Sequence, residues 1–332
     1  MISVVIPLYN KAHTIEETLL TVVNQTFTDF EIIIVNDGSK DNGVEIIRQN
    51  FKDPRIRIIN QENQGVSVAR DRGVEEARSN YIAFLDADDK WHPDYLKIMN
   101  VAITRYPDAA LYSSGSLIYN ADGSISYRLA KKYLNKIVVC DFFENPHVYI
   151  HTSATIINKS IFQLTDGSPR GMLRSQDYAL FFQIALKGPF VYIGLPISKY
   201  IGGVPGQATS STAENNFKTL KCFCYLYNFI QEKNRNVQNM SLNAFFRYAL
   251  RHSFKQCIKE RNYNNLDFYL THLSDDCLSL FYKWEVLLYK KRRRFMSLLW
   301  IDFTKLLWRA SGKAVLFEHF KINSIHEKYL NW

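Results

Sequence analysis

Short, nearly continuous apolar runs alternate with amphipathic stretches through the first hundred residues of the chain. The apolar runs are rich in Ile and Val, which is typical of strands that are buried on both faces of a parallel sheet. We expect strands at Ser3–Ile6, Ile32–Val35, Ile56–Ile59 and Ile82–Leu85. The intervals between them are long enough for crossover helices, so the pattern predicts successive βαβ units and an α/β fold.

Helical patterns fill the intervals between the expected strands. Thr14 and Glu17 have the spacing of a capping box, and apolar residues follow at helical intervals. Two further helices are expected over Val66–Ala77 and Pro93–Arg105. Ligands of parallel α/β sheets bind at the carboxyl ends of the strands, so the residues after each strand are the candidates for chemistry.

Polar, acidic and aromatic residues follow three of the expected strands. They are PLYN at 7–10, NDGS at 36–39 and DADD at 86–89. Because the carboxyl ends of parallel strands share one edge, we expect these segments to converge. Carboxylates held close together repel one another unless a cation offsets them, and Mg²⁺ typically takes one or two carboxylates plus ligand phosphates. Asp86 and Asp88 therefore predict a metal and diphosphate site, although a lone Asp-x-Asp is more often a turn or a helix cap.

Other nucleotide-binding patterns are missing from the sequence. It contains no GxGxxG motif, which disfavours a dinucleotide-binding fold. Gly38 and Gly43 have the spacing of P-loop glycines, but Val44 and Glu45 stand where Lys and Ser or Thr are needed. A bound diphosphate would therefore have to be neutralised by a metal at the Asp-x-Asp.

Charge and aromatic residues divide the chain into two parts. Residues 217–332 contain 20 Lys and Arg against 9 Asp and Glu, whereas residues 1–216 contain 21 against 23. The C-terminal part also holds 24 of the 47 aromatic residues. A stretch rich in turn formers precedes this shift, at 202–212. We therefore expect a first domain over 1–210 and a basic, aromatic, helical region over 217–332.

A basic cluster precedes an amphipathic helix near the end of the chain. The cluster is Lys290–Arg294 and the helix is expected over Phe295–Arg309. Its apolar arc comprises Phe295, Met296, Leu299, Trp300, Phe303, Leu306 and Leu307. This combination is typical of a helix that lies in the plane of an anionic membrane surface, and the alternative is a helix packed on the first domain. No nucleic-acid-binding motif accompanies the charge, so we expect no nucleic-acid partner.

The cysteines and the N-terminus bear on the cellular compartment. Five Cys residues form no CxxC pair, which favours reduced thiols over a disulfide framework or a zinc site. No run approaches the roughly 20 apolar residues of a membrane-spanning helix, and the first ten residues lack the basic start of a secretory signal. We expect a cytoplasmic protein, peripheral at the inner face of the membrane.

Four motifs together resemble the N-terminal half of family 2 glycosyltransferases, which have the GT-A fold. They are VVIPLYN (4–10), IIIVNDGSKD (32–41), NQGVSVARDRG (63–73) and FLDADDKWHPDYL (84–96). A weaker match continues to roughly residue 210 through HTSATIINKS (151–160) and SQDYALFFQIAL (175–186). The resemblance implies a Rossmann-like, mostly parallel central sheet, with a nucleotide-sugar-binding half over 1–105 and an acceptor half over 106–210.

The resemblance also implies roles for individual residues. The nucleotide-binding residues would be Pro7, Tyr9, Asn10, Asp37, Arg70 and Asp86. Tyr9 would pack on the base with Pro7, Asp37 would accept the ring N–H of uracil, and Asp86 would reach the ribose. Asp88 would bind the Mn²⁺ or Mg²⁺ ion that bridges the diphosphate.

Structural alternatives remain for several of these residues. Asp37 is also a candidate for the first residue of a turn, and Arg70 for a surface partner of Glu62 or Asp71. We expect Asp89 to be structural and hydrogen-bonded to the helix that follows it.

The family's catalytic base is the Asp of a Glu-Asp pair at a helix start, and this sequence has Gln176-Asp177 there. Asp177 is therefore the implied base, and a helix N-cap is its structural alternative. Gln183 is a second departure, because Arg is common at that position. The implied function is metal-dependent, inverting transfer of a sugar, with a UDP-sugar favoured, to a saccharide or lipid-linked saccharide in bacterial-type surface polysaccharide or glycolipid synthesis. Because Gln176 removes a charge, a nucleotide-sugar-binding protein with little or no turnover is the alternative.

Overall fold

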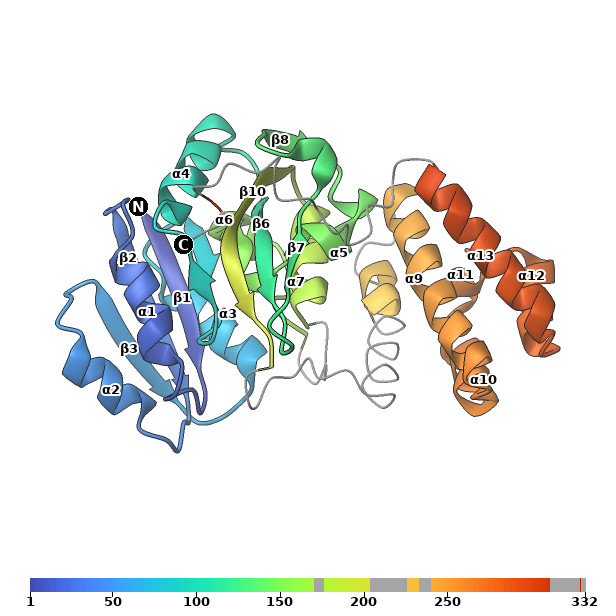
Figure 1. Ribbon diagram of the computed structural model, residues 1–332, viewed down its shortest axis with the longest axis horizontal. Coiled ribbons are helices and arrows are strands. Elements are labelled where there is room, and N and C mark those ends of the chain that lie inside the picture. Colours follow the sequence, from blue (N-terminus) through green and yellow to red (C-terminus); the bar gives the residue numbers. More distant parts are fainter. Residues whose placement is uncertain (170–175, 204–225, 233–239, 311–328, 330–332) are drawn as a thin grey trace.

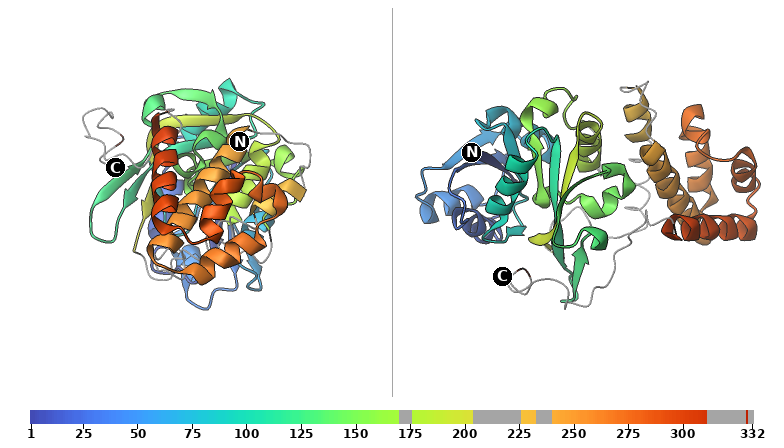
Figure 2. Two further views of the ribbon diagram at one scale, coloured as in Figure 1. Left: turned by 90° about the vertical axis from the view of Figure 1, so that its right-hand side faces the viewer. Right: turned by 90° about the horizontal axis from the view of Figure 1, so that it is seen from above.

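The protein has an α/β domain at one end and a group of helices at the other (Figure 1). The structure is a computed structural model that describes residues 1–169, 176–203, 226–232, 240–310 and 329. Seen from above, the C-terminal helices again lie to one side of the sheet domain, and in the end-on view they lie in front of it (Figure 2). The boundary expected between residues 210 and 217 lies outside the described residues.

A ten-stranded sheet forms the centre of the α/β domain. Its strands are β1 (Ile2–Leu8), β2 (Phe30–Asp37), β3 (Ile56–Gln61), β4 (Tyr81–Phe84), β5 (Lys90–Trp91), β6 (Leu111–Tyr119), β7 (Ile125–Arg128), β8 (Ile137–Cys140), β9 (Thr155–Asn158) and β10 (Phe190–Ile201). The order is β3-β2-β1-β4-β9-β6-β10-β5, with β7 paired to β6 and β8 to β10. Strands β1, β2, β3, β4, β6 and β10 run in one direction and the others against it. The predicted fold class, α/β with a mostly parallel sheet, is confirmed.

Helices cover the sheet and form the C-terminal region. They are α1 (Ile15–Val23), α2 (Gly43–Asn50), α3 (Val66–Glu76), α4 (Tyr95–Arg105), α5 (Pro146–Tyr149), α6 (Lys159–Phe162), α7 (Gln176–Ala185), a helix over 226–232, α9 (Met240–Lys259), α10 (Tyr263–His272), α11 (Asp275–Leu278), α12 (Lys283–Lys290) and α13 (Arg294–Ala310). Short 3₁₀ helices are η1 (Lys131–Tyr133), η2 (Phe142–Glu144) and η3 (Thr152–Ala154). None of the described helices is long and apolar enough to cross a membrane.

The first four strands lie where the apolar runs predicted them. The runs are continuous because alternate residues of a strand enter two different cores. On β1, Val4 and Ile6 belong to the core shared with α1 and α4, whereas Val5 belongs to the core shared with α3. Both faces of the strand are therefore buried. Helix α3 approaches β1 so closely that a Cβ on Gly73 would lie 2.2 Å from a methyl group of Val5.

The capping box expected at the start of α1 does not form. Thr14 precedes the helix, but its side chain makes no capping hydrogen bond. Glu17 instead forms an ion pair with Lys90, with 2.5 Å between the charged atoms. The helix is held by its buried apolar face, so the motif located the helix start without supplying its predicted bonds.

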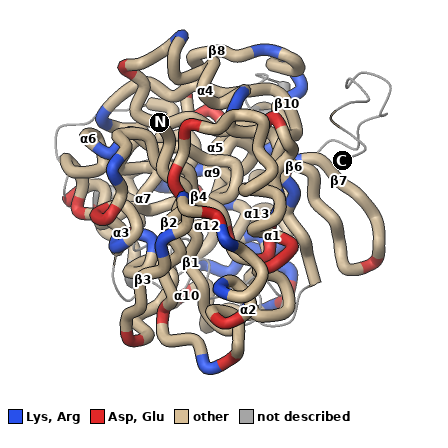
Figure 3. The backbone as a smooth tube through the Cα atoms, turned by 90° about the vertical axis from the view of Figure 1, so that its left-hand side faces the viewer, with Lys and Arg blue, Asp and Glu red and all other residues tan. Residues whose placement is uncertain are grey.

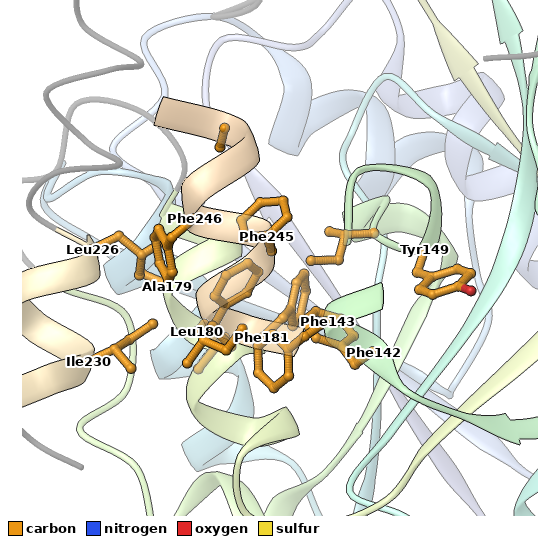
Figure 4. Close-up of a cluster of buried hydrophobic side chains, with 14 of the residues drawn as sticks. Phe142, Phe143, Tyr149, Ala179, Leu180, Phe181, Leu226, Ile230, Phe245 and Phe246 are labelled. Carbon is orange, nitrogen blue, oxygen red and sulfur yellow. The ribbon is translucent and has the colours of Figure 1, made fainter. Parts of the chain in front are cut away.

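An aromatic cluster joins the C-terminal helices to the α/β domain (Figure 4). Phe182 of α7 lies 5.4 Å from Phe245 and 6.0 Å from Phe246 of α9, measured between ring centroids. Phe142 and Phe143 of η2 pack on the same Phe182 ring. The sheet domain and helix α9 therefore share one continuous core.

Helix α13 forms as predicted, and most of its apolar arc is exposed. Phe295 is 76% exposed and Leu306 is 61% exposed, and Met296, Leu299, Phe303 and Leu307 are exposed as well. The helix contacts α9 and α12 through the opposite side, where Ser297 and Ile301 are buried. The alternative of a helix packed on the first domain is therefore wrong for α13, whereas α9 takes that position.

Candidate active site

The carboxyl ends of β1, β2 and β4 meet at one edge of the sheet, beside the point where the strand order reverses. The backbone N–H of Asn10 donates to Ser39 Oγ at 3.2 Å, and Asn10 Oδ1 accepts from the N–H of Lys40 at 2.9 Å. Lys11 Nζ lies 2.7 Å from Asp88 Oδ2. The predicted convergence of the three polar segments is therefore confirmed, and Figure 3 shows acidic and basic residues interspersed at this end of the molecule.

The turn after β1 begins later than the sequence predicted. β1 continues through Leu8, so Pro7 is a buried strand residue and not part of the turn. Tyr9 follows the strand and is 44% exposed. Asn10 adopts a left-handed backbone with φ of 51°, a conformation that Asn tolerates better than most residues. Of the predicted base-packing pair, Tyr9 alone offers an exposed ring.

Asp37 ends β2 and is only 2% exposed. Its Oδ1 accepts from Gln61 Nε2 at 2.8 Å and from the N–H of Gln64 at 2.9 Å, and its Oδ2 accepts from the N–H of Gly65 at 2.9 Å. The turn that follows is held by Asn36 instead, whose Oδ1 accepts from the backbone of the NDGS serine at 3.0 Å. Asp37 therefore fixes the start of α3, and since a carboxylate has about four acceptor positions it retains capacity for a ligand N–H.

Arg70 on α3 is buried and faces the carboxylate segment after β4. Its Nη2 lies 2.5 Å from Asp86 Oδ1. Burial acts to lower the pKa of Arg70, but the charges of Asp86 and Asp177 outweigh it and raise that pKa. The expected surface partner Asp71 instead accepts hydrogen bonds from the N–H and hydroxyl of Ser168. The surface-pair alternative for Arg70 is therefore wrong.

Asp88 forms an ion pair with Lys11, and both side chains are largely buried. No group of three or more His, Cys, Asp or Glu side chains is placed to hold a metal among the described residues. A donor set of one carboxylate still fits Mg²⁺ or Mn²⁺, because these ions keep open positions for ligand phosphates and water. Asp88 therefore suits a metal held jointly with a diphosphate.

Asp89 is buried but does not bond to the helix that follows it, so that prediction is wrong. Its Oδ2 lies 3.1 Å from His151 Nε2 and accepts from Ser153 Oγ at 2.5 Å, while Oδ1 accepts from the N–H of Ile201 at 3.2 Å. Burial raises the pKa of Asp89, and the hydrogen bond from His151 opposes that change. Its structural role is confirmed, with partners far away in the sequence.

Residues 151–153 connect the carboxylate segment to the predicted base, a role that sequence reasoning missed. The Ser153 hydroxyl that bonds Asp89 also accepts from the N–H of Asp86 at 3.1 Å. Thr152 Oγ1 donates to Asp177 Oδ2 at 3.3 Å. These three residues belong to the motif HTSATIINKS, which marks the resemblance. A sequence motif does not indicate which distant side chains become their partners.

Asp177 is the second residue of α7, within its first turn. Its Oδ1 accepts from the N–H of Tyr178 at 2.9 Å. An acidic side chain is favourable at this end of a helix, but the position is inside the helix and so the N-cap alternative does not hold. Through Thr152 and the charge of Arg70, the structure places Asp177 at the same edge as Asp86.

Gln183, the second departure from the family pattern, supports a loop. Its Oε1 accepts from the N–H of Asp166 at 3.1 Å, and its Nε2 donates to the carbonyl oxygen of Gly167 at 3.0 Å. The residue is buried on α7. It therefore acts on the shape of the loop before α7 and not on the carboxylates directly.

Comparison with known proteins agrees with this geometry. The family described as Glycosyl transferase family 2 matches residues 3–163. The uncharacterized glycosyltransferase YibD of Escherichia coli K12 is 44% identical over 111 residues, which cover 33% of this chain and 32% of that protein. An uncharacterized glycosyltransferase of Rickettsia felis is 41% identical over 195 residues, covering 57% of this chain and 32% of that protein. The chain thus spans about a third of the length of these curated relatives.

Solved structures share the fold over almost the whole chain. Residues 1–349 of Staphylococcus aureus TarS, in complex with UDP-GlcNAc, superpose with a TM-score of 0.67 at 13% identity, covering 96% of this chain and 94% of that one. The same TarS segment in complex with UDP gives a TM-score of 0.63 at 14% identity, with coverage of 97% and 94%. At this identity the likeness shows a common fold.

Proposed function

We propose that this chain, whose residues 3–163 match the model of glycosyltransferase family 2, transfers a sugar from a nucleotide-diphosphate donor to a hydroxyl acceptor, with inversion at the anomeric carbon. One observation carries the proposal. Asp177, from a helix late in the domain, shares an edge with Asp86 and Asp88, which directly follow β4. A direct displacement needs the base and the diphosphate site at the same edge, on either side of the anomeric carbon.

The donor would lie along the carboxyl edge of β1, β2 and β4. Tyr9 offers a ring for stacking on the base, and stacking of this kind contributes about 1–3 kcal/mol per base. Asp37 would accept a ring N–H, which favours uracil and hence a UDP-sugar. Asp86 would accept from the ribose while Arg70 holds its carboxylate in place.

Asp177 would act as the general base. As the acceptor oxygen attacks the anomeric carbon, its proton moves to an Asp177 carboxylate oxygen. The bond between that carbon and the diphosphate oxygen breaks, and its electron pair leaves with the diphosphate. Because the attack comes from the face opposite the leaving group, the configuration inverts. Thr152 holds the carboxylate through its hydroxyl.

Asp88 would hold Mn²⁺ or Mg²⁺ together with the donor diphosphate. The ion supplies Lewis-acid stabilisation of the charge that develops on the leaving diphosphate. Lys11 pairs with Asp88 in this structure. Its ammonium group is therefore placed to help neutralise the negative charge that develops on the leaving diphosphate.

The acceptor is a saccharide or a lipid-linked saccharide in bacterial surface polysaccharide or glycolipid synthesis. A relative supports this class: the putative teichuronic acid biosynthesis glycosyltransferase TuaG of Bacillus subtilis is 42% identical over 99 residues, covering 29% of this chain and 39% of that protein. We place the reaction in the cytoplasm, with the enzyme peripheral at the inner face of the membrane. The support is the exposed apolar arc of α13 beside the basic cluster Lys290–Arg294.

A thermal-shift panel of nucleotide sugars, with and without Mn²⁺, tests the donor. The correct donor stabilises the folded state by RT ln(1 + [L]/Kd), about 2.7 kcal/mol at a hundredfold excess over Kd. Asp88→Ala should remove the Mn²⁺-dependent part of UDP binding in titration calorimetry, whereas Asp108→Ala, an exposed acidic residue before β6, should not. Unchanged affinity in Asp88→Ala would remove this residue from the metal site.

An alternative function is nucleotide-sugar binding with little or no turnover, which Gln176 favours because it stands where the family has Glu. Transfer assays with the identified donor and a panel of saccharide acceptors separate the two functions. Donor binding with no transfer to any acceptor would establish the alternative. Restoration of transfer by Gln176→Glu would assign the loss to this position.

A further inference from the structure

A cavity of about 290 Å³ lies within the C-terminal helices, away from the carboxyl edge of the sheet. Helix α9, the residue before α12 and helix α13 line it. Its lining includes the cations Arg247, Arg251, Lys255 and Lys305, together with the ring of His252. None of the described residues that line it is Asp or Glu. The cavity is therefore lined by cations on two facing helices.

Arg251 and Lys255 have carboxylate partners. Arg251 forms two hydrogen bonds of 2.7 Å with the buried Glu285, and Lys255 forms an ion pair with Asp302. Arg247 differs, because its buried Nε has no hydrogen-bond partner among the described parts of the chain. Buried donors without partners are rare and costly, so an acceptor inside the cavity would stabilise this side chain.

The lysines of the lining act on its histidine. Desolvation and the charges of Lys305 and Lys255 lower the pKa of His252. Two aromatic rings, Tyr282 and Trp300, complete the wall, with 6.0 Å between their centroids. A phosphate group, which accepts several charged hydrogen bonds, suits such a lining.

The cavity adjoins the exposed apolar arc of α13. Leu307 belongs to both, since it lines the cavity and is 52% exposed. Tyr282 and its stacked neighbour Trp284 are exposed beside it, and such amphipathic rings are typical of membrane interfaces. A cationic cavity therefore opens next to an apolar surface that has no covering among the described residues.

We propose that this cavity binds the phosphate of an anionic membrane lipid, whose acyl chains lie along the apolar arc of α13. The charge of the lining matches the phosphate, and the adjoining Phe295, Leu299 and Phe303 match the chains. A free phosphate ion would use the cations alone and leave the apolar arc in water. The inference does not depend on sugar transfer, because no residue of the candidate active site is involved.

Binding to vesicles of phosphatidylglycerol in phosphatidylcholine tests the proposal, at about 0.5 M salt, where the Debye length falls to roughly 4 Å and diffuse attraction is screened. The double variant Arg247→Gln/Lys305→Gln should bind at least about tenfold more weakly than the unchanged protein. The matched control Lys259→Gln/Lys283→Gln removes the same charge from exposed residues outside the cavity and should bind normally.

A second variant, Thr304→Phe, fills the cavity without removing any charge and should also weaken vesicle binding. Thermal unfolding of each variant shows that it is folded. Equal loss in the pocket and control pairs would mean diffuse attraction and overturn the proposal. If the protein binds inorganic phosphate but no vesicles, the cavity is a site for free phosphate and the lipid assignment is overturned.

Discussion

The carboxyl edge of the sheet and the outer surface of the C-terminal helices use charge in opposite ways. At the edge, carboxylates are matched by partners from distant segments, as in the pairs of Asp86 with Arg70 and Asp88 with Lys11. On the outer helices, the exposed basic cluster Lys290–Arg294 lies beside exposed apolar side chains. The two regions share one core, but the paired polar groups of the edge are largely buried, whereas the basic cluster is exposed and its ion pair between Arg292 and Asp267 is exposed too.

This difference separates a site for a small ligand from a surface for a large one. Fixed polar groups cost little reorganisation when a polar ligand binds, which suits a nucleotide sugar. A row of exposed apolar residues of this length marks an interaction surface. Changing residues in each region should therefore affect different measurements, and the predictions below run from the largest expected effect to the smallest.

The largest effect on stability is expected from Glu285→Ala. Glu285 is fully buried, bonded to Arg251 and to the hydroxyl of Tyr289, so its loss leaves a buried guanidinium without its partner. Breaking such a pair costs about 3–5 kcal/mol. Chemical unfolding should show this loss, whereas Glu260→Ala, which is exposed on the same region, should change stability by less than about 0.5 kcal/mol. A small effect in both would mean that the helices are held by apolar packing alone.

Asp177→Asn should slow sugar transfer by at least about 100-fold, which corresponds to about 2.7 kcal/mol in the activation barrier. The amide keeps the shape and the hydrogen bond from Thr152 but cannot take the acceptor proton. Donor affinity should stay unchanged, because the predicted donor contacts lie at the carboxyl ends of β1, β2 and β4 and on α3. Single-turnover assays with saturating donor measure this, and rates near those of the unchanged protein would point to another base.

The sequence predicted the first half of this edge well because its information is local. Nearly continuous apolar runs located the strands, and the polar residues at the end of each run located Asp37, Asp86 and Asp88. The partners Lys11 and His151 were missed, since a pairing across tens of residues depends on which strands become neighbours. The antiparallel strand β9, inserted between β4 and β6, brings residues 151–153 to the edge, and no periodicity encodes that insertion.

The C-terminal region shows the same limit. The helical wheel located the apolar arc of α13, but a wheel cannot tell which side a neighbouring helix covers. Ile301 lies off the predicted arc and is nevertheless buried, while Phe295 on the arc is exposed. The covered side of α13 faces α9 and α12, and α9 in turn packs on Phe182, a residue far away in the sequence.

Acid should weaken the junction between the two regions through His147. Its ring contacts Phe245 and the hydroxyl of Tyr178, and burial lowers its pKa from 6.5 to about 4. Between these values the unfolded chain binds a proton that the folded protein does not, so stability falls as the pH decreases. The loss between pH 8 and pH 5 should be about 2 kcal/mol. The free energy of unfolding, measured across this pH range, should depend less on pH in His147→Gln than in the unchanged protein. His13→Gln, which replaces an exposed histidine, should keep the full dependence.

The smallest effect on the fold is expected when Lys290–Arg294 are replaced by Gln. These residues are exposed, and the 2.8 Å ion pair between Arg292 and Asp267 is exposed too, so stability should change by less than about 0.5 kcal/mol. UDP binding should also be unchanged, because the cluster lies far from the carboxyl edge. Attraction to an anionic vesicle should nevertheless fall, since each basic residue near the lipid surface contributes about 1 kcal/mol before screening. Co-sedimentation with anionic and neutral vesicles at low and high salt measures this. Equal sedimentation with both lipids, or none with either, would show that the basic cluster has no membrane role. The outer helices would then differ from the carboxyl edge only in their exposed apolar arc.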